Sequence, residues 1–394
     1  MTVRDRDLRL VAGAIGVSAI GDFIALIALA LRIHDMWKSF GVAILFICLW
    51  SPLVLLAGHV GILVDNVETR SLAIVAAAFQ AVIAVGLAFT HSVPMLLVLT
   101  FVLGVGVAVS QAAEFALIPL LIGSRSVGRA NGLVESVRGV GFMIGPLIGG
   151  ALAAGAGTRT ALLVDAATFV VIGAVLARLP VRRRVEQRLG EAPRARDGIT
   201  LLFSDRTLAI SMAVGAFSLV FMSASIPGDF AYVQDVLGVK NIGFGVVLTA
   251  WAVGMIVASN TLPQRIPAHA LAMVTLLAAC VQGLSKFIAP FWLVFAFMIG
   301  CYLVGGAGHG VKNAGFRTLI HQRVDPASHG RAFAAYNGLR NSAELVALAG
   351  GGVLVATVGG RGTLWIAGGL AALAGLAGAV ALATSRREPQ PLLD

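Results

Sequence analysis

Four ionisable side chains lie inside long apolar stretches of the sequence. Asp22 is near the middle of one stretch and Glu344 near the middle of another, while His309 and Lys312 are three positions apart in a third. At the centre of a lipid bilayer a charged side chain costs at least about 2.5–3.5 kcal/mol, so each of these residues needs a reason to be there. Acids and bases in such a setting suit the uptake and release of protons, and we expect that chemistry from these four residues.

Two interpretations of these residues remain open. Asp22 is either a proton carrier or a structural carboxylate bonded to hydroxyls or backbone of a neighbouring helix. Glu344 lies one helical turn after Arg340, so an intrahelical ion pair is the alternative to proton binding there. Lys312 and His309 would share one helix face, from which Lys312 would contact Glu344 on the next helix. Our hypothesis is that Asp22 or Glu344 takes the proton and that Lys312 or His309 adjusts its affinity.

Five more ionisable residues lie nearer the ends of the apolar stretches. Glu135 and Arg138 are three positions apart, and Glu114 belongs to the preceding stretch. We interpret these three residues as a polar network at the inner ends of two helices. We expect its role to be structural more than substrate-binding. Asp165 and Asp229 are expected at outer helix ends, close to the membrane interface and solvated.

Composition identifies the membrane as the solvent of this chain. Of 394 residues, 58% are hydrophobic and 12% are charged, against roughly 45–50% and about 25% in an average soluble domain. Apolar stretches of membrane-spanning length recur between short polar breaks, and helices are what such stretches form in lipid. The sequence therefore predicts an all-helical membrane protein of twelve transmembrane helices, at 9–33, 40–64, 71–90, 95–122, 130–155, 160–179, 207–229, 243–262, 269–289, 291–318, 332–357 and 363–384.

The positive charges indicate orientation and exclude nucleic-acid binding. Most of the 29 Lys and Arg lie in alternate breaks, with no single stripe that could follow a phosphate backbone. The positive-inside rule then places both termini in the cytoplasm of a multi-pass protein of a bacterial-type inner membrane. The few basic residues left for the outer breaks are Lys38, Arg159, Lys240, Lys286 and Arg361.

An internal repeat divides the chain into two halves. Gly128-Arg129-Ala130 opens the fifth predicted helix and Gly330-Arg331-Ala332 opens the eleventh. Between the halves lies an Arg-rich break that is poor in apolar residues. We predict an N-terminal six-helix bundle at 1–179, a basic cytoplasmic linker at 180–206, and a C-terminal six-helix bundle with a short tail at 207–394.

Two local motifs carry backbone and packing information. The loop after the second predicted helix contains Gly61, Leu63, Asp65 and Arg70, where Gly61 permits close helix approach and Asp65 can cap or pair. The fifth predicted helix contains a run in which the proline kinks the helix and the glycines form a flat face for a neighbouring helix. The residues of this run are Gly141, Gly145, Pro146, Gly149 and Gly150.

These features together resemble the major facilitator superfamily over essentially the whole chain. The loop at Gly61 to Arg70 is similar to the family's cytoplasmic gating motif, although Asn66, Glu68 and Thr69 depart from it. The run in the fifth helix resembles the motif that the family reserves largely for exporters. Gly21-Asp22 and Gly330-Arg331-Ala332-Phe333 look like the branch of macrolide and multidrug efflux pumps and siderophore exporters, and the lysophospholipid transporter shares them.

The resemblance implies a secondary transporter that works by alternating access. Its partners would be a small amphipathic substrate, protons and the bilayer, with a monomeric protein and no cofactor. It implies an inner gate formed by Gly61, Asp65, Arg70, Glu114, Glu135 and Arg138, and aromatic cavity residues of which Phe217, Phe221 and Trp251 are the candidates.

Several functions compete within and outside transport. A proton-coupled antiporter that exports drugs or natural products leads; a lipid or lysophospholipid flippase and a siderophore exporter are alternatives, and polar nutrient import ranks below them. No lysine ends a Gly-x-x-x-x-Gly-Lys-Ser/Thr loop, which excludes an ATP-driven pump.

Cys48, Cys280 and Cys301 lie in separate stretches without metal-ligand spacing, so we expect no metal site. No nucleophile, base or metal pattern supports a membrane enzyme.

Overall fold

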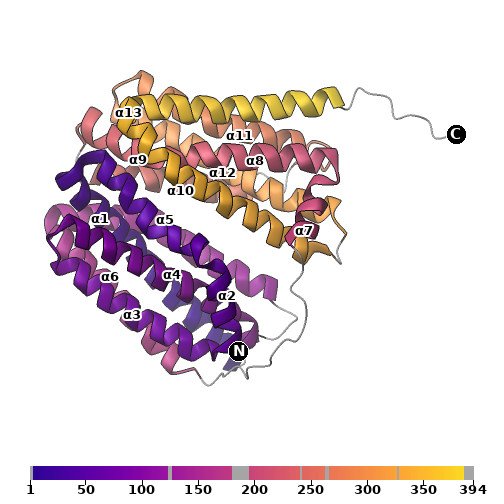
Figure 1. The fold of residues 1–394 in the computed structure, drawn as a ribbon. Coiled ribbons are helices and arrows are strands. Elements are labelled where there is room, and N and C mark those ends of the chain that lie inside the picture. Colours follow the sequence, from indigo (N-terminus) through magenta and orange to yellow (C-terminus); the bar gives the residue numbers. More distant parts are fainter. Residues whose placement is uncertain are drawn as a thin grey trace. The chain divides into compact units, whose positions relative to one another are not determined.

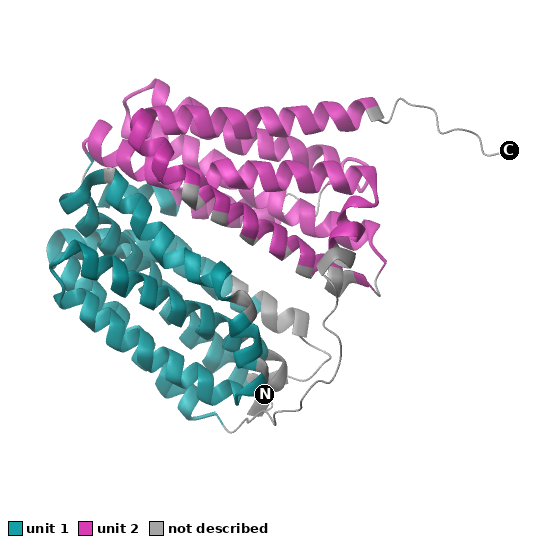
Figure 2. Ribbon diagram, in the orientation of Figure 1, with its two compact units in different colours: residues 1–190, 239–249 teal, residues 191–238, 250–394 magenta. Residues whose placement is uncertain are grey.

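Helices make up nearly all of the described chain, as expected for backbone that must satisfy its own hydrogen bonds in lipid. A computed structural model describes residues 3–122, 127–179, 195–239, 242–261, 266–325 and 328–385 (Figure 1). The chain divides into two compact units, residues 1–190 with 239–249 and residues 191–238 with 250–394 (Figure 2).

Unit 1 is a helical bundle in which α1 packs on α4, α5 and α6, and α3 packs on α4 and α6. Its buried core is built from small and branched apolar side chains such as Ala12, Ile15 and Ala113. The first residues of α10 also belong to this unit. Its helices are α1 (Val3–Leu55), α2 (Ala57–Asn66), α3 (Thr69–Phe89), α4 (Val93–Ile122), α5 (Val127–Gly155) and α6 (Gly157–Ala177).

Unit 2 is a second bundle, in which α13 packs on α8 and α11, and α11 packs on α12. Its core includes Leu276, Phe316 and Leu319. Its elements are α7 (Ala195–Phe203), α8 (Arg206–Ala224), α9 (Ile226–Ala231), a π-helical turn (Tyr232–Val236), α10 (Ile242–Thr261), α11 (Leu271–Ile288), a 3-10 turn (Ala289–Phe291), α12 (Phe295–Arg323) and α13 (His329–Ser385).

Two of the long helices contain a break where the sequence predicted a connection between spans. In α1 the break is at Lys38, whose φ of 56° is in the left-handed region. In α13 it is at Gly359, with φ of 69°, a conformation that glycine adopts without steric cost. The predicted span 9–33 and the first part of span 40–64 thus share α1, and the spans 332–357 and 363–384 share α13.

Other predicted boundaries shift for local reasons. The second span divides between Leu55 and Ala57, four residues after Pro52. The span predicted to stop at 229 continues through α9 and the π-helical turn to Val236, because Pro227 occupies the first turn of α9, where a proline is tolerated. Within the predicted linker, residues 195–203 form α7, while 180–194 lie outside the described residues.

Candidate functional site

A polar cluster crosses unit 1 through side chains from four helices. Asp22 on α1 is exposed, and it interacts electrostatically with Glu114 on α4 and Arg138 on α5. Glu114 and Arg138 form an ion pair of 2.5 Å. The predicted association of these two residues is therefore present in the structure. The side chain of Glu135, the third member of the predicted network, lies outside the described residues.

Asp165 joins this cluster, which corrects the prediction that it is solvated at a helix end. Its side chain on α6 is buried and lies close enough to Asp22 to interact electrostatically with it. The helix begins at Gly157, three residues earlier than predicted, so Asp165 lies eight residues inside it, about 12 Å along the axis. The sequence signal that could have found it was Gly21, which lets α1 approach α6 at this level.

A second cluster lies in unit 2 around Lys286 of α11. The Lys286 ammonium donates to Asp229 at 2.6 Å and to the Ser225 hydroxyl at 2.5 Å. The Tyr302 hydroxyl donates to the other oxygen of Asp229 at 2.6 Å. Since Lys286 and Asp229 are 4% and 2% exposed, both predictions for them were wrong: neither an outer break for Lys286 nor a solvated helix end for Asp229 is present.

Trp251 connects this ion pair to His309 on α12. Its ring lies 5.3 Å from the Lys286 ammonium, and its centroid lies 5.7 Å from that of His309. The other two aromatic candidates, Phe217 and Phe221, are in contact along α8, with tilted rings whose centroids are 4.8 Å apart, and Phe217 is 47% exposed. The structure thus places Trp251 beside the Lys286 ammonium and the His309 ring and leaves Phe217 accessible.

Two amides hold the His309 ring. Gln282 Nε2 lies 3.1 Å from Nδ1, and Asn313 Nδ2 lies 2.9 Å from Nε2. A neutral imidazole has one donor and one acceptor nitrogen, so it cannot accept from both amides. Gln282 Oε1 has no partner among the described residues, and turning that amide over lets Oε1 accept from Nδ1–H. This arrangement satisfies a neutral His309.

Lys312 and Glu344 do not meet as the sequence suggested. Lys312 on α12 is 2% exposed and forms no ion pair with any carboxylate among the described residues. Glu344 on α13 is half-buried and interacts electrostatically with Arg340. Glu344 thus interacts with Arg340 of its own helix, which is the intrahelical alternative, and the expected ion pair with Lys312 is not formed among the described residues.

The gating-motif residues have separate environments. Among the described residues, no atom of a neighbouring element lies within 4 Å of the position of a Cβ on Gly61. The side chain of Asp65 lies outside the described residues. Arg70 donates from Nε to the Leu176 carbonyl at 2.9 Å and from Nη2 to the Ala177 carbonyl at 2.5 Å. Arg70 therefore caps the carboxyl end of α6.

We expect Arg70→Gln to lower the free energy of unfolding by about 1 kcal/mol, because two carbonyls at the end of α6 lose a charged donor. Thermal unfolding of the purified protein in detergent would measure this. Arg70→Lys should be intermediate, since one ammonium keeps the charge without the fork that reaches both carbonyls. Unfolding of Arg70→Gln at the wild-type temperature would show that the cap contributes nothing.

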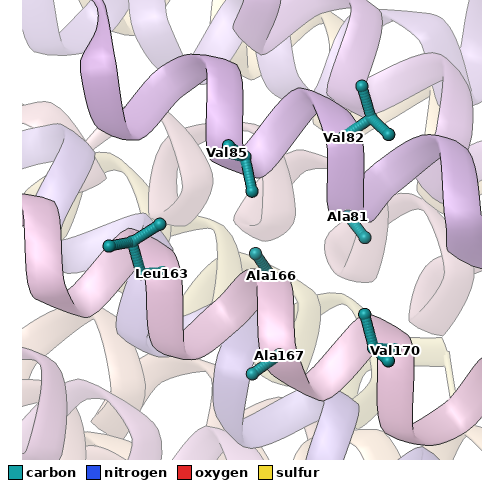
Figure 3. Close-up of a pocket in the computed structure, with 7 residues that line it drawn as sticks. All are labelled: Ala81, Val82, Val85, Leu163, Ala166, Ala167 and Val170. Atoms are coloured by element: carbon teal, nitrogen blue, oxygen red, sulfur yellow. The ribbon is translucent and has the colours of Figure 1, made fainter.

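An apolar groove lies between α3 and α6. It has a volume of about 430 Å³, and Figure 3 shows its lining side chains on these two helices. None of them is polar, so the groove offers no group for binding a proton or orienting a polar substrate. The lining residues are Ala81, Val82, Val85, Leu163, Ala166, Ala167 and Val170.

The glycines of the fifth predicted helix pack α5 on α1, as expected. A Cβ on Gly141 would lie 2.7 Å from Ala19 Cβ, one on Gly145 2.6 Å from Phe23 Cβ, and one on Gly149 2.9 Å from Ile24 Cα. Gly150 is buried as well. At Pro146 the carbonyl faces Gly245, at the start of α10, where a Cβ would lie 2.3 Å from the oxygen. These glycines set the position of the helix that carries Asp22.

Sequence comparison identifies the family. Residues 11–348 match the profile of the Major Facilitator Superfamily. The chain belongs to the major facilitator superfamily. It is a multi-pass membrane protein and a secondary transporter, not an enzyme. Within the described residues, nine helical stretches are long and apolar enough to span a membrane.

Solved structures of several other transporters share the fold at low sequence identity. The nucleoside transporter NupG has a TM-score of 0.71 and 12% identity, with 97% of this chain and 100% of that chain covered. A bacterial homologue of the iron transporter ferroportin, in an inward-facing state, has a TM-score of 0.72 and 15% identity over 98% and 100% of the two chains. A POT family transporter in complex with a peptide conjugate has a TM-score of 0.75 and 10% identity over 97% and 96%. No curated protein sequence matches this chain. At these identities the likeness concerns the fold alone, and the prediction of an all-helical major facilitator fold is confirmed.

Proposed function

We propose that this transporter exports small amphipathic molecules, drugs or natural products, in exchange for protons. The observation that carries the proposal is Asp22, an exposed carboxylate in the middle of a membrane-spanning helix, beside the Glu114–Arg138 ion pair. A carboxylate held there can gain and lose a proton as the site opens to either side. Proton binding would bias one conformation through its different affinity for the two states.

The export direction rests on the α5 run, whose glycines seat α1 and therefore Asp22. The proposed inner gate comprises Gly61, Asp65, Arg70, Glu114, Glu135 and Arg138, and Phe217, Phe221 and Trp251 would contact the apolar part of the substrate. Glu344, Lys312 and His309 are the proposed proton-coupling residues of unit 2. We place the protein, as a monomer, in a bacterial-type inner membrane with both termini in the cytoplasm, on the distribution of Lys and Arg.

Proton flux in liposomes tests the proposal. Purified protein would be reconstituted with an imposed pH gradient and an internal pH dye, and challenged with macrolides, lipophilic cations, siderophores and lysolipids in turn. We expect one compound class to release protons through the wild type and Asp22→Asn to reduce this release at least tenfold. Glu344→Gln tests the acid of unit 2, and Asp325→Asn, which alters an exposed acid after α12, serves as the matched control.

Two results would contradict the proposal. Compounds that cross without moving protons in any variant would identify a facilitator or, for lysolipids, a lipid flippase. Equal proton release by wild type and Asp22→Asn would place the coupling acid elsewhere.

A further inference from the structure

Gly21 brings the backbone of α1 against a carboxylate of α6. A Cβ at Gly21 would lie 2.7 Å from Asp165 Oδ1 and 2.3 Å from Thr168 Oγ1, closer than side-chain atoms pack. Only glycine allows this approach at the present helix separation. Asp22 follows Gly21 directly, and the two carboxyl groups interact electrostatically. Helix α1 thus presents one acid next to another.

Asp165 lacks the partners that a buried carboxylate requires. It is 1% exposed, and neither carboxyl oxygen accepts a hydrogen bond from any described residue. The neighbouring Thr168 hydroxyl donates instead to the backbone carbonyl of Asp165 at 2.8 Å, which uses its single hydrogen. An ionised carboxylate in this position would be desolvated without compensation. A bound proton removes that penalty and supplies a donor.

The charged groups around Asp22 and Asp165 supply no hydrogen-bond donor to the Asp165 carboxyl group among the described residues. Glu114 of α4 and Arg138 of α5 face Asp22 and are paired with each other. Three described basic residues of the packed helices have other partners: Arg32 donates to the Leu87 carbonyl, Arg70 caps α6, and Arg159 lies over the Phe89 ring. None of these three donates to Asp165, whose carboxyl oxygens accept no hydrogen bond from the described residues.

We propose that Asp22 and Asp165 form one proton-binding site in which a single proton is shared between the two carboxyl groups. Two carboxylates that interact strongly do not ionise independently, since the first negative charge opposes the second. Uptake of one proton from water forms one O–H bond and changes the charge of the pair from −2 to −1. Release returns the same proton to water.

The two acids have different parts in this site. Asp22 is exposed and exchanges the proton with water, while buried Asp165 holds it by a hydrogen bond. Gly21 is a positioning residue, because its missing side chain permits the contact. This inference rests on the proposed proton coupling at Asp22 and adds Asp165, a residue of another helix, to the same site.

Infrared spectroscopy of the purified protein tests the site without a substrate. The C=O stretch of protonated carboxyl groups would be followed in stepwise pH titrations of wild type, Asp165→Asn, Asp22→Asn and the control Asp325→Asn. A shared proton predicts two separated carboxyl steps in the wild type and the control. Each single variant should lose one step, and its remaining carboxyl should titrate at a pH different from either wild-type step.

The inference is overturned if Asp165→Asn loses only its own signal and leaves the Asp22 step at its wild-type pH. Should Asp165→Asn fail to fold, Asp22→Asn carries the same test, because the exposed residue can be changed without filling a buried position and must still move the Asp165 band. The liposome assay separates the two proposals. Coupled infrared steps without proton transport would retain the carboxyl pair and remove the exporter, and proton transport with independent steps would do the reverse.

Discussion

Lys286→Met should destabilise unit 2 by about 3–5 kcal/mol, because it leaves the Asp229 carboxylate buried without its cation. Asp229 would keep only the Tyr302 hydroxyl as a donor among the contacts described above. The substitution also removes the contacts of the Lys286 ammonium with the Ser225 hydroxyl and with the Trp251 ring. Methionine fills a similar volume, so the loss reflects charge rather than a cavity. Unfolding in detergent, followed by temperature or denaturant, would measure the effect.

The double variant Lys286→Met with Asp229→Leu provides the matched control. Removing both charges relieves the uncompensated burial, so we expect most of the lost stability to return. A double variant as unstable as Lys286→Met would mean that packing, and not the unpaired charge, causes the loss. Wild-type stability of Lys286→Met would mean that the ion pair is dispensable.

The ion pair of unit 2 shows where sequence reasoning stops. Lys286 and Asp229 are 57 positions apart, and both were assigned to interfaces from their distance to an expected helix end. The helix at Asp229 runs on for seven residues beyond the predicted end, so the residue is about two turns further from the end of the span than expected. A short error in a boundary thus changes a solvated acid into a buried one.

Contacts within one half of the chain could be predicted from the sequence when the residues lie on neighbouring helices or recur at helical spacing. The Glu114–Arg138 pair links neighbouring helices along the chain, and the glycines of α5 recur every four residues on one face. Both patterns follow from helical periodicity. The electrostatic interaction between Asp22 and Asp165 joins the first and sixth predicted helices, and nothing in the spacing of the two acids along the sequence specifies it. The packing of α1 on α6, which Gly21 permits, brings them together.

Gly145→Ala should separate α1 from α5 and reduce both stability and proton coupling. The new Cβ would lie 2.6 Å from Phe23 Cβ and 2.9 Å from the Ile20 carbonyl oxygen, so the helices must move apart or bend. Overpacking of this kind typically costs about 1–3 kcal/mol. It would also disturb the edge-to-face contact of Phe23 with Phe142, whose centroids are 5.1 Å apart. Since Phe23 follows Asp22 directly, the displacement moves the proposed proton site.

Gly155→Ala is the matched control on the same helix, because no described atom lies within 4 Å of its Cβ position. We expect wild-type unfolding and wild-type proton release from it, and a lower unfolding temperature with weakened proton release from Gly145→Ala. Gly149→Ala, at 2.9 Å from Ile24 Cα, should behave like Gly145→Ala. If Gly145→Ala loses stability but releases protons as the wild type does, these glycines pack α1 without positioning Asp22. That result would mean that the proton site tolerates a shift of its own helix. The glycines of the α5 run would then have a structural role and no role in the export mechanism.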